Sequence, residues 1–199
     1  MNPIRDFVVR VPSAFKDTVD LGGTELYLYT RFTPDDLQIQ YGEIVSVPLK
    51  WDLGARPGDT LFFHHHVTTN ESLHLEGDDY MVIYDLGLNG LNNQAIAYRS
   101  KETGELHALG EWVLTEPVDN PKAQETTTSF GIILPPSDSE PKYRTDVCRI
   151  VATNPELEEM GLATGDIVHF DNYSNYKLEL EDGSDVFRMR ARNLTAKEL

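Results

Sequence analysis

The segment Gly165-Asp-Ile-Val-His-Phe170 has a counterpart earlier in the chain, Gly58-Asp-Thr-Leu-Phe-Phe63, at a spacing of 107 positions (58 to 165). Each joins a Gly-Asp pair, typical of a tight turn, to a run of β-branched and aromatic residues. That combination predicts a strand that begins directly after a turn. The two segments therefore indicate one structural unit that occurs twice.

Two further pairs of segments keep the same order and almost the same spacing. Asp6–Pro12 aligns with Glu111–Pro117 at a spacing of 105 positions (6 to 111). Asp79–Val82 falls near Asp185–Arg188 at a spacing of 106 positions (79 to 185). Solenoid repeats have periods of roughly 20 to 50 residues, so a repeat of this length indicates a duplicated domain.

The length of 199 residues accommodates two domains of ordinary size. A polar turn, Ser100-Lys-Glu-Thr-Gly-Glu105, separates the two copies. We therefore predict an N-terminal domain over residues 1–100, the more divergent copy, and a C-terminal domain over residues 101–199.

Composition restricts the possible partners and compartment. The formal net charge of −16 opposes binding to nucleic acid and to anionic membranes. Cys148 is the single cysteine, which excludes an intramolecular disulfide framework and a thiolate zinc cluster. The N-terminus lacks the apolar core of a signal peptide, and no apolar run approaches the roughly 18 residues of a membrane helix. These features predict a cytoplasmic protein.

Short runs rich in Val, Ile, Tyr, Phe and Leu, bounded by Gly, Pro, Asn and Asp, predict an all-β chain. The predicted strands are Phe7–Val11, Glu43–Val47, Thr60–Val67, Tyr80–Tyr84, Gln94–Tyr98, Trp112–Thr115, Val147–Val151, Ile167–Phe170, Lys177–Leu180 and Val186–Met189. One helical turn is predicted over Pro155–Met160, with Asn154 as its N-cap and Gly161 at its end.

Two long segments, Ser13–Gln40 and the polar, proline-bearing Asp119–Arg144, follow the first predicted strand of each copy. Loops longer than about 12–15 residues in a compact domain are usually functional or disordered. Each segment contains an apolar island, Leu21–Tyr29 in the first and Phe130–Pro135 in the second. Such an island can dock in a groove of another protein. The alternative, equally weighted on these residues alone, is an ordinary strand of the domain's own sheet.

The order of motifs in the second half resembles that of the GroES-type co-chaperonins. Their subunits have a first strand, a loop with an aliphatic tripeptide, two further strands and a C-terminal strand that pairs near the first. The corresponding segments here are Trp112–Leu114, Gly131–Leu134, Asp146–Val151, Gly165–Phe170 and Arg192–Ala196.

The first half resembles the same family more loosely. Tyr41–Val47, Gly58–Phe63 and Asn93–Tyr98 fit its strands. The loop departs from the pattern, because it carries the partly aromatic Leu26-Tyr-Leu28 in place of the aliphatic tripeptide.

The resemblance implies an all-β fold of two tandem GroES-like small β-barrels, each with a long loop after its first strand. It implies a homo-oligomeric ring that caps an ATP-driven, GroEL-like chaperonin and assists the folding of an enclosed, unfolded substrate protein. Such a protein is not an enzyme and needs no cofactor, since the nucleotide binds the chaperonin. The docking residues would be Ile132, Ile133 and Leu134, with Leu26, Tyr27 and Leu28 as a second set.

The histidine run offers an enzyme alternative. His64 and His66, two apart on a predicted strand, would face the same side and could chelate a metal. With Gly58, Glu71 and Gly77 they come close to the first motif of metal-dependent cupin enzymes, although the second cupin motif has no convincing match. The interpretation favoured by sequence is that these are surface histidines, so no metal site is assigned.

A second alternative is a ring-forming scaffold protein that has no chaperonin partner. Other catalytic patterns are missing from the sequence, which has neither a Gly-x-Ser-x-Gly elbow nor a phosphate-binding loop with lysine. Cys148 lies in a predicted core strand, where an inert buried thiol is expected.

Overall fold

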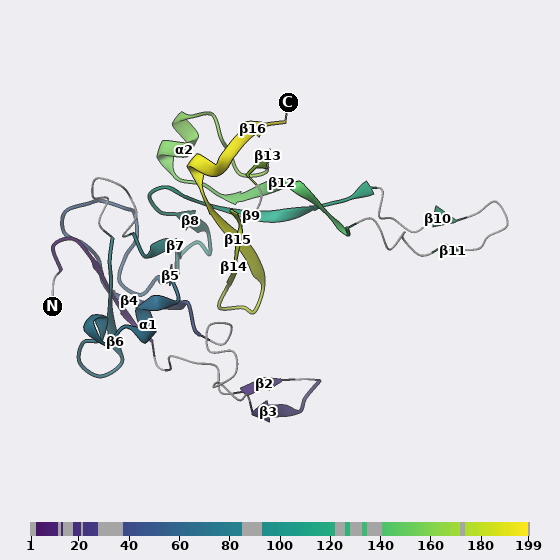
Figure 1. Ribbon diagram of the computed structural model, residues 1–199. Helices are drawn as coiled ribbons and strands as arrows, with labels where there is room; N and C mark the ends of the chain where they lie inside the picture. The colour runs from purple at the N-terminus through teal and green to yellow at the C-terminus, as the bar shows by residue number, and fades with distance from the viewer. Residues whose placement is uncertain are drawn as a thin grey trace. The chain divides into compact units, whose positions relative to one another are not determined.

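A computed structural model of the protein describes residues 3–11, 13, 18–20, 22–27, 38–84, 93–121, 126–127, 133–134, 141–171 and 174–198 (Figure 1). The chain is dominated by antiparallel strands, which confirms the predicted all-β class. It forms two compact units. The first comprises Met1–Gly110 with Glu179–Ser184, and the second comprises Glu111–Leu178 with Asp185–Leu199.

The first unit is built on a six-stranded sheet in the order β6-β1-β4-β5-β7-β8. The strands are β1 (Phe7–Arg10), β4 (Tyr41–Ser46), β5 (Thr60–Phe63), β6 (Asp79–Val82), β7 (Ala95–Arg99) and β8 (Leu106–Ala108). Between β5 and β6 lie the helix α1 (His66–Thr69) and the 3₁₀ turn η1 (Glu71–Leu73). Between β1 and β4, the strands β2 (Thr18–Asp20) and β3 (Glu25–Tyr27) form a separate two-stranded sheet.

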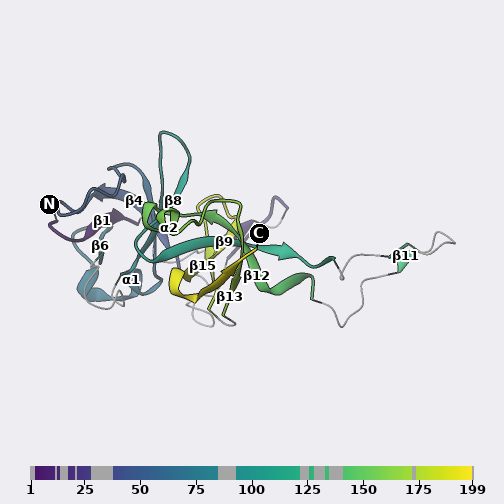
Figure 2. The same cartoon turned by 90° about the horizontal axis from the view of Figure 1, so that it is seen from above.

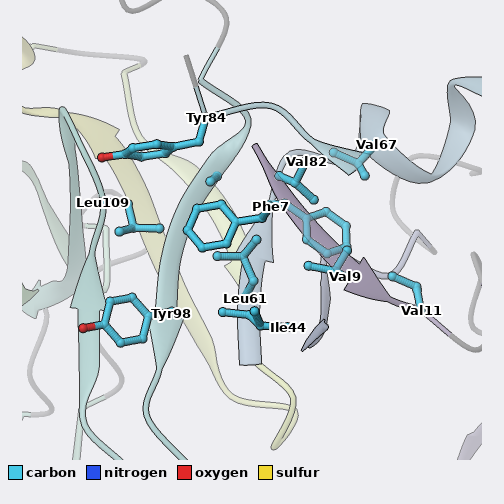
Figure 3. Packing of buried hydrophobic residues seen from close by; sticks show 12 residues of the cluster. Phe7, Val9, Val11, Ile44, Leu61, Val67, Val82, Tyr84, Tyr98 and Leu109 are labelled. Atoms are coloured by element: carbon cyan, nitrogen blue, oxygen red, sulfur yellow. The ribbon is translucent and has the colours of Figure 1, made fainter. Parts of the chain in front are cut away.

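The core of the first unit consists of aliphatic and aromatic side chains from these strands (Figure 3). Phe7 and Val9 on β1 pack with Leu61 on β5, and all three are fully buried. The Phe7 ring meets the Tyr84 ring edge to face at 5.7 Å, a favourable aromatic geometry. Val67 brings α1 into the same cluster, so this short helix is fixed by burial.

The second unit is built on a six-stranded sheet in the order β14-β15-β9-β12-β13-β16. The strands are β9 (Trp112–Asp119), β12 (Tyr143–Ala152), β13 (Ile167–Phe170), β14 (Tyr176–Glu179), β15 (Asp185–Arg190) and β16 (Leu194–Lys197). The helix α2 (Pro155–Glu159) follows β12, and the 3₁₀ turn η3 (Ala191–Asn193) precedes β16. The core contains Val113, Ile150, Leu157, Val168 and Met189.

The two sheets share an order of five strands. The series β6-β1-β4-β5-β7 in the first unit corresponds to β15-β9-β12-β13-β16 in the second. The turn before the fourth strand of each series has the same backbone hydrogen bonds. Gly58 N–H donates to Ile44 O and Gly165 N–H donates to Ile150 O, both at 2.8 Å. These glycines have φ of +94° and +93°, a conformation that L side chains rarely adopt.

Most predicted strands form close to their predicted bounds, but β9 and β12 extend further than predicted. The predicted helical turn is confirmed as α2, because Asn154 Oδ1 accepts a hydrogen bond from Leu157 N–H at 3.1 Å. Gly161 follows it with φ of +84°. The expected pairing of the C-terminal strand near the first is wrong, since β16 pairs with β13.

The predicted strand over Thr60–Val67 is wrong in its second half. Pairing with β7 shifts register after Phe62, and the strand ends at Phe63. His65 then adopts a helical conformation with φ −52° and ψ −27°. This turn allows Val67 to enter the core, and burial of an aliphatic side chain outweighs the local strand preference.

Candidate partner-binding site

The strands β9 and β12 form a ribbon that leads into the second long segment (Figure 2). Among the described pairings, β15 joins β9 at Trp112–Thr115 and β13 joins β12 at Val147–Arg149. Beyond these positions β9 and β12 pair with each other, as far as Tyr143 opposite Asp119. The ribbon therefore extends beyond the positions at which β15 and β13 flank it.

The ribbon is closed by hydrogen bonds at its end. Asn120 N–H donates to Lys142 O at 2.9 Å, and the Asn120 side-chain amide donates to Pro141 O at 2.9 Å. These bonds hold the two ends of the segment between residues 121 and 141 close together. Asn120 thus fixes, through both its backbone and its side chain, the place where the segment between residues 121 and 141 leaves the ribbon.

Within this segment, β10 (Thr126–Thr127) pairs with β11 (Ile133–Leu134). The pair forms its own two-stranded sheet and does not join the six-stranded sheet. Ile133 and Leu134 therefore do not belong to the six-stranded sheet of the domain. The alternative that they form an ordinary strand of that sheet is wrong. Ile132, the first predicted docking residue, lies outside the described residues.

The first long segment contains the corresponding pair, β2 and β3. Val19 of β2 lies opposite Leu26 of β3 in the antiparallel register. Leu26 is 44% exposed and Tyr27 is 85% exposed, so the structure presents both predicted residues to solvent. Leu28 lies outside the described residues.

The surface of the second unit has a hollow beside the outer part of the β9–β12 ribbon. The hollow has a volume of about 610 Å³, and its lining includes Pro117, Tyr143, Thr145 and Phe187. Cys148 also lines it but is almost fully buried, and burial raises the pKa of its thiol to about 11. A thiol with this pKa is protonated near neutral pH, as expected for an inert buried cysteine.

Polar and charged side chains connect the ribbon to β13 and to Glu198, which follows β16. Arg144 Nη2 lies 3.0 Å from Glu198 Oε1. His169 Nε2 lies 3.4 Å from the same oxygen, and its Nδ1 lies 3.6 Å from Asp146 Oδ2. Partly exposed ion pairs contribute little stability individually, so these contacts add little to the stability of the fold.

The histidine run does not have the geometry predicted for a cupin site. His64 follows the end of β5, and His66 begins α1, so the two do not project from one strand face. Glu71 begins η1 and is not a member of the donor cluster that the histidines form. The cluster instead includes His65, a residue that the strand-based interpretation placed on the opposite face.

The ribbon is the main feature that sequence reasoning missed. A signal was present, since Trp112–Asp119 and Tyr143–Ala152 are both longer than the predicted strands and contain several β-favouring residues. Pro117, which has no backbone N–H to donate, weakens the strand signal in the outer part of β9. Among the helices that the structure describes, none has the length and apolar character needed to span a membrane.

The second unit is thus a small antiparallel β-module with a two-stranded insertion between its first two strands. Residues 105–198 match the family model described as chaperonin 10 Kd subunit. This match covers slightly less than half of the chain and assigns residues 105–198 to the GroES family of co-chaperonins, whose members are not enzymes and have a chaperonin as partner. No curated protein matches the chain.

Proposed function

We propose that this protein forms a homo-oligomeric ring that caps an ATP-driven chaperonin in the cytoplasm and encloses a substrate protein during folding. The observation that carries the proposal is the position of Ile133 and Leu134. They form a strand of a separate two-stranded sheet, in the insertion of the unit that matches the co-chaperonin family.

The docking step would use the aliphatic residues Ile132, Ile133 and Leu134 in an apolar groove of the chaperonin. An extended segment binds through alternate side chains and, at a sheet edge, through its backbone. Ordering a loop on binding costs conformational entropy, which makes one contact weak. The hydrogen bonds of Asn120 at the end of the ribbon reduce this entropy cost, because they already position the two ends of the loop.

Ring symmetry would multiply these weak contacts. Several identical loops on one ring raise the effective concentration of each further loop once the first has bound. Each single contact stays weak enough for release when the chaperonin changes state. Nucleotide binding and hydrolysis would belong to the chaperonin.

We further propose that residues 1–100 form a second, divergent module of the same type as residues 101–199. Its support is the shared order of five strands and the matching turns at Gly58 and Gly165. The exposed Leu26 and Tyr27, with Leu28, would provide a second set of contacts. The aromatic side chain at position 27 indicates a contact surface different from that of the aliphatic set.

The acidic composition agrees with this function. A net charge of −16 repels nucleic acid and favours solubility. On the wall of a closed cage, the same charge would disfavour persistent adhesion of an acidic substrate chain. The charge suits a capping role, is explained equally well by solubility, and does not specify the substrate.

The test is native mass spectrometry of the chain alone and with a chaperonin and ATP. We expect a closed ring that joins the chaperonin in the presence of nucleotide. The double variant Ile133→Ser/Leu134→Ser should assemble normally and fail to join. A chain that stays monomeric or dimeric and ignores the chaperonin would overturn the proposal.

A matched control removes two apolar side chains outside the loop. Leu49 and Met160 are 68% and 61% exposed, so Leu49→Ser/Met160→Ser removes exposed apolar surface without changing the 121–141 segment. This control should cap the chaperonin as the parent does. The variant Leu26→Ser/Tyr27→Ser then separates the roles of the two loops, and unchanged capping would remove the first loop from the docking set.

A further inference from the structure

Three consecutive histidines cluster at the junction between β5 and α1 in the first unit. The ring centroids of His64 and His65 are 4.1 Å apart, those of His65 and His66 are 4.1 Å apart, and those of His64 and His66 are 4.7 Å apart. One ring nitrogen from each residue lies within 4.8 Å of the other two. Three nitrogen donors thus converge on one small volume.

The backbone that carries the cluster is fixed on both sides by the core. Phe63 immediately before it and Val67 immediately after it are fully buried. His64 N–H donates to Gln94 O at 2.9 Å, and Val67 N–H donates to His64 O at 3.0 Å. Because both anchors lie within one turn, the backbone keeps the three side chains next to one another.

The cluster is open to solvent, so an ion can reach it from outside. His66 is exposed, and His64 and His65 are partly exposed. A metal ion could enter without opening the core, and water could complete its coordination. The site therefore resembles an open three-nitrogen arrangement more than a closed structural centre.

The distances fit an imidazole-bound transition metal after small side-chain rotations. Zn²⁺–N bonds of about 2.0–2.1 Å place tetrahedral nitrogen ligands roughly 3.3 Å apart. The three donor nitrogens lie within 4.8 Å of one another here. Rotation about χ1 and χ2 of the side chains can bring them to the shorter separation. His66 N–H donates to His64 Nδ1 at 3.4 Å, a long and weak bond whose loss on metal binding costs little.

We propose that His64, His65 and His66 form a binding site for a divalent late first-row transition metal such as Zn²⁺, Ni²⁺ or Cu²⁺. Neutral imidazole prefers these ions, whereas Mg²⁺ and Ca²⁺ prefer oxygen donors. Sequence alone favoured ordinary surface histidines. The convergence of all three rings, including His65, reverses that preference. The proposal is independent of the co-chaperonin function.

The test is isothermal titration calorimetry of the chelator-treated full chain with Zn²⁺. We expect one ion per chain, and no comparable binding of Mg²⁺. The triple variant His64→Gln/His65→Gln/His66→Gln should lose this site. Because loss of an outer-shell partner alone weakens metal sites by about 10–100-fold, the exposed His66→Gln change should weaken binding at least tenfold.

Matched variants remove histidines elsewhere. His74→Gln and His107→Gln each delete one imidazole and should bind Zn²⁺ as the parent does. Circular dichroism should show that each variant retains its strands. Zn²⁺ binding that survives the triple variant, or that never saturates in the parent, would overturn the proposal.

A second comparison separates a folded site from a histidine-rich sequence. Three adjacent histidines bind metal weakly even in an unfolded chain. The native protein should therefore bind Zn²⁺ at least tenfold more tightly than the same protein unfolded in urea, at equal pH. Equal affinity in the two states would contradict a site organised by the fold.

Discussion

Asp59 and Asp166 have the same role in the two units. The Asp59 carboxylate accepts a hydrogen bond from Arg56 N–H at 2.8 Å, and the Asp166 carboxylate accepts one from Ala163 N–H at 2.7 Å. Both residues follow a glycine with positive φ. The two carboxylates differ in their second partner, which is the Lys101 backbone N–H for Asp59 and the Lys197 ammonium for Asp166.

Replacement of Asp59 should destabilise the first unit. The variant Asp59→Ala leaves two partly buried backbone N–H groups without their acceptor, and an unsatisfied donor costs about 1–3 kcal/mol. We expect a corresponding decrease in the free energy of unfolding in urea. The exposed Asp78→Ala serves as control and should leave stability nearly unchanged.

Acid should remove the contribution of Asp166. The hydrogen bond from Lys197, followed by that from Ala163 N–H, lowers the pKa of the Asp166 carboxyl below its usual value. Its stabilisation is therefore complete above the unfolded aspartate pKa of about 3.9 and is lost as the pH falls through the lower folded pKa. Asp166→Asn should be less stable than the parent at neutral pH, and the difference should decrease in acid. A difference that is constant with pH would contradict this assignment.

The Cys148 thiol should be unreactive in the native protein. Burial raises its pKa to about 11, above the usual value of about 8.5 for a free cysteine. At pH 8, a disulfide reagent such as Ellman's reagent should label it slowly in buffer and rapidly in urea. Rapid labelling of the folded chain would show that the hollow beside the ribbon admits reagents to the thiol.

The equivalent core positions Ile44 and Ile150 should respond alike. Each is 1% exposed, and each is hydrogen bonded through its backbone to the Gly-Asp turn of its unit. Ile44→Ala and Ile150→Ala should each cost about 2–5 kcal/mol in the free energy of unfolding, through lost burial and the remaining cavity. Val45→Ala, at a 37% exposed neighbour, is the control. A loss in one unit and not in the other would show that the two turns differ in their energetic role.

The sequence predicted those elements whose local chemistry and burial agree. The Gly58 and Gly165 turns, the strands that follow them and the Asn154-capped helix all belong to this group. The edge strand β8 was not predicted, because it is three residues long and buries only Ala108. The strand β16 was expected only from the family resemblance of Arg192–Ala196, because its residues are mostly exposed and show weak alternation.

The strand predicted through the histidine run was wrong for a different reason. His64-His-His66 continues a strand-like pattern, and only the burial of Val67 in the core shows that the chain must turn there. Tertiary packing overrides local preference at such positions. The clustering of the three rings follows from that turn, so sequence could name His64 and His66 as candidates but could not place His65 beside them.

The hydrogen-bonded end of the β9–β12 ribbon has a consequence for the evolution of loop length. Asn120 holds the two ends of the segment between residues 121 and 141 together through its bonds to Lys142 and Pro141. Each doubling of the length of such a loop costs only about 0.6 kcal/mol in closure entropy. Insertions and deletions between residues 121 and 141 should therefore be tolerated by the fold, and the reach of the loop can change while the module that carries it stays the same.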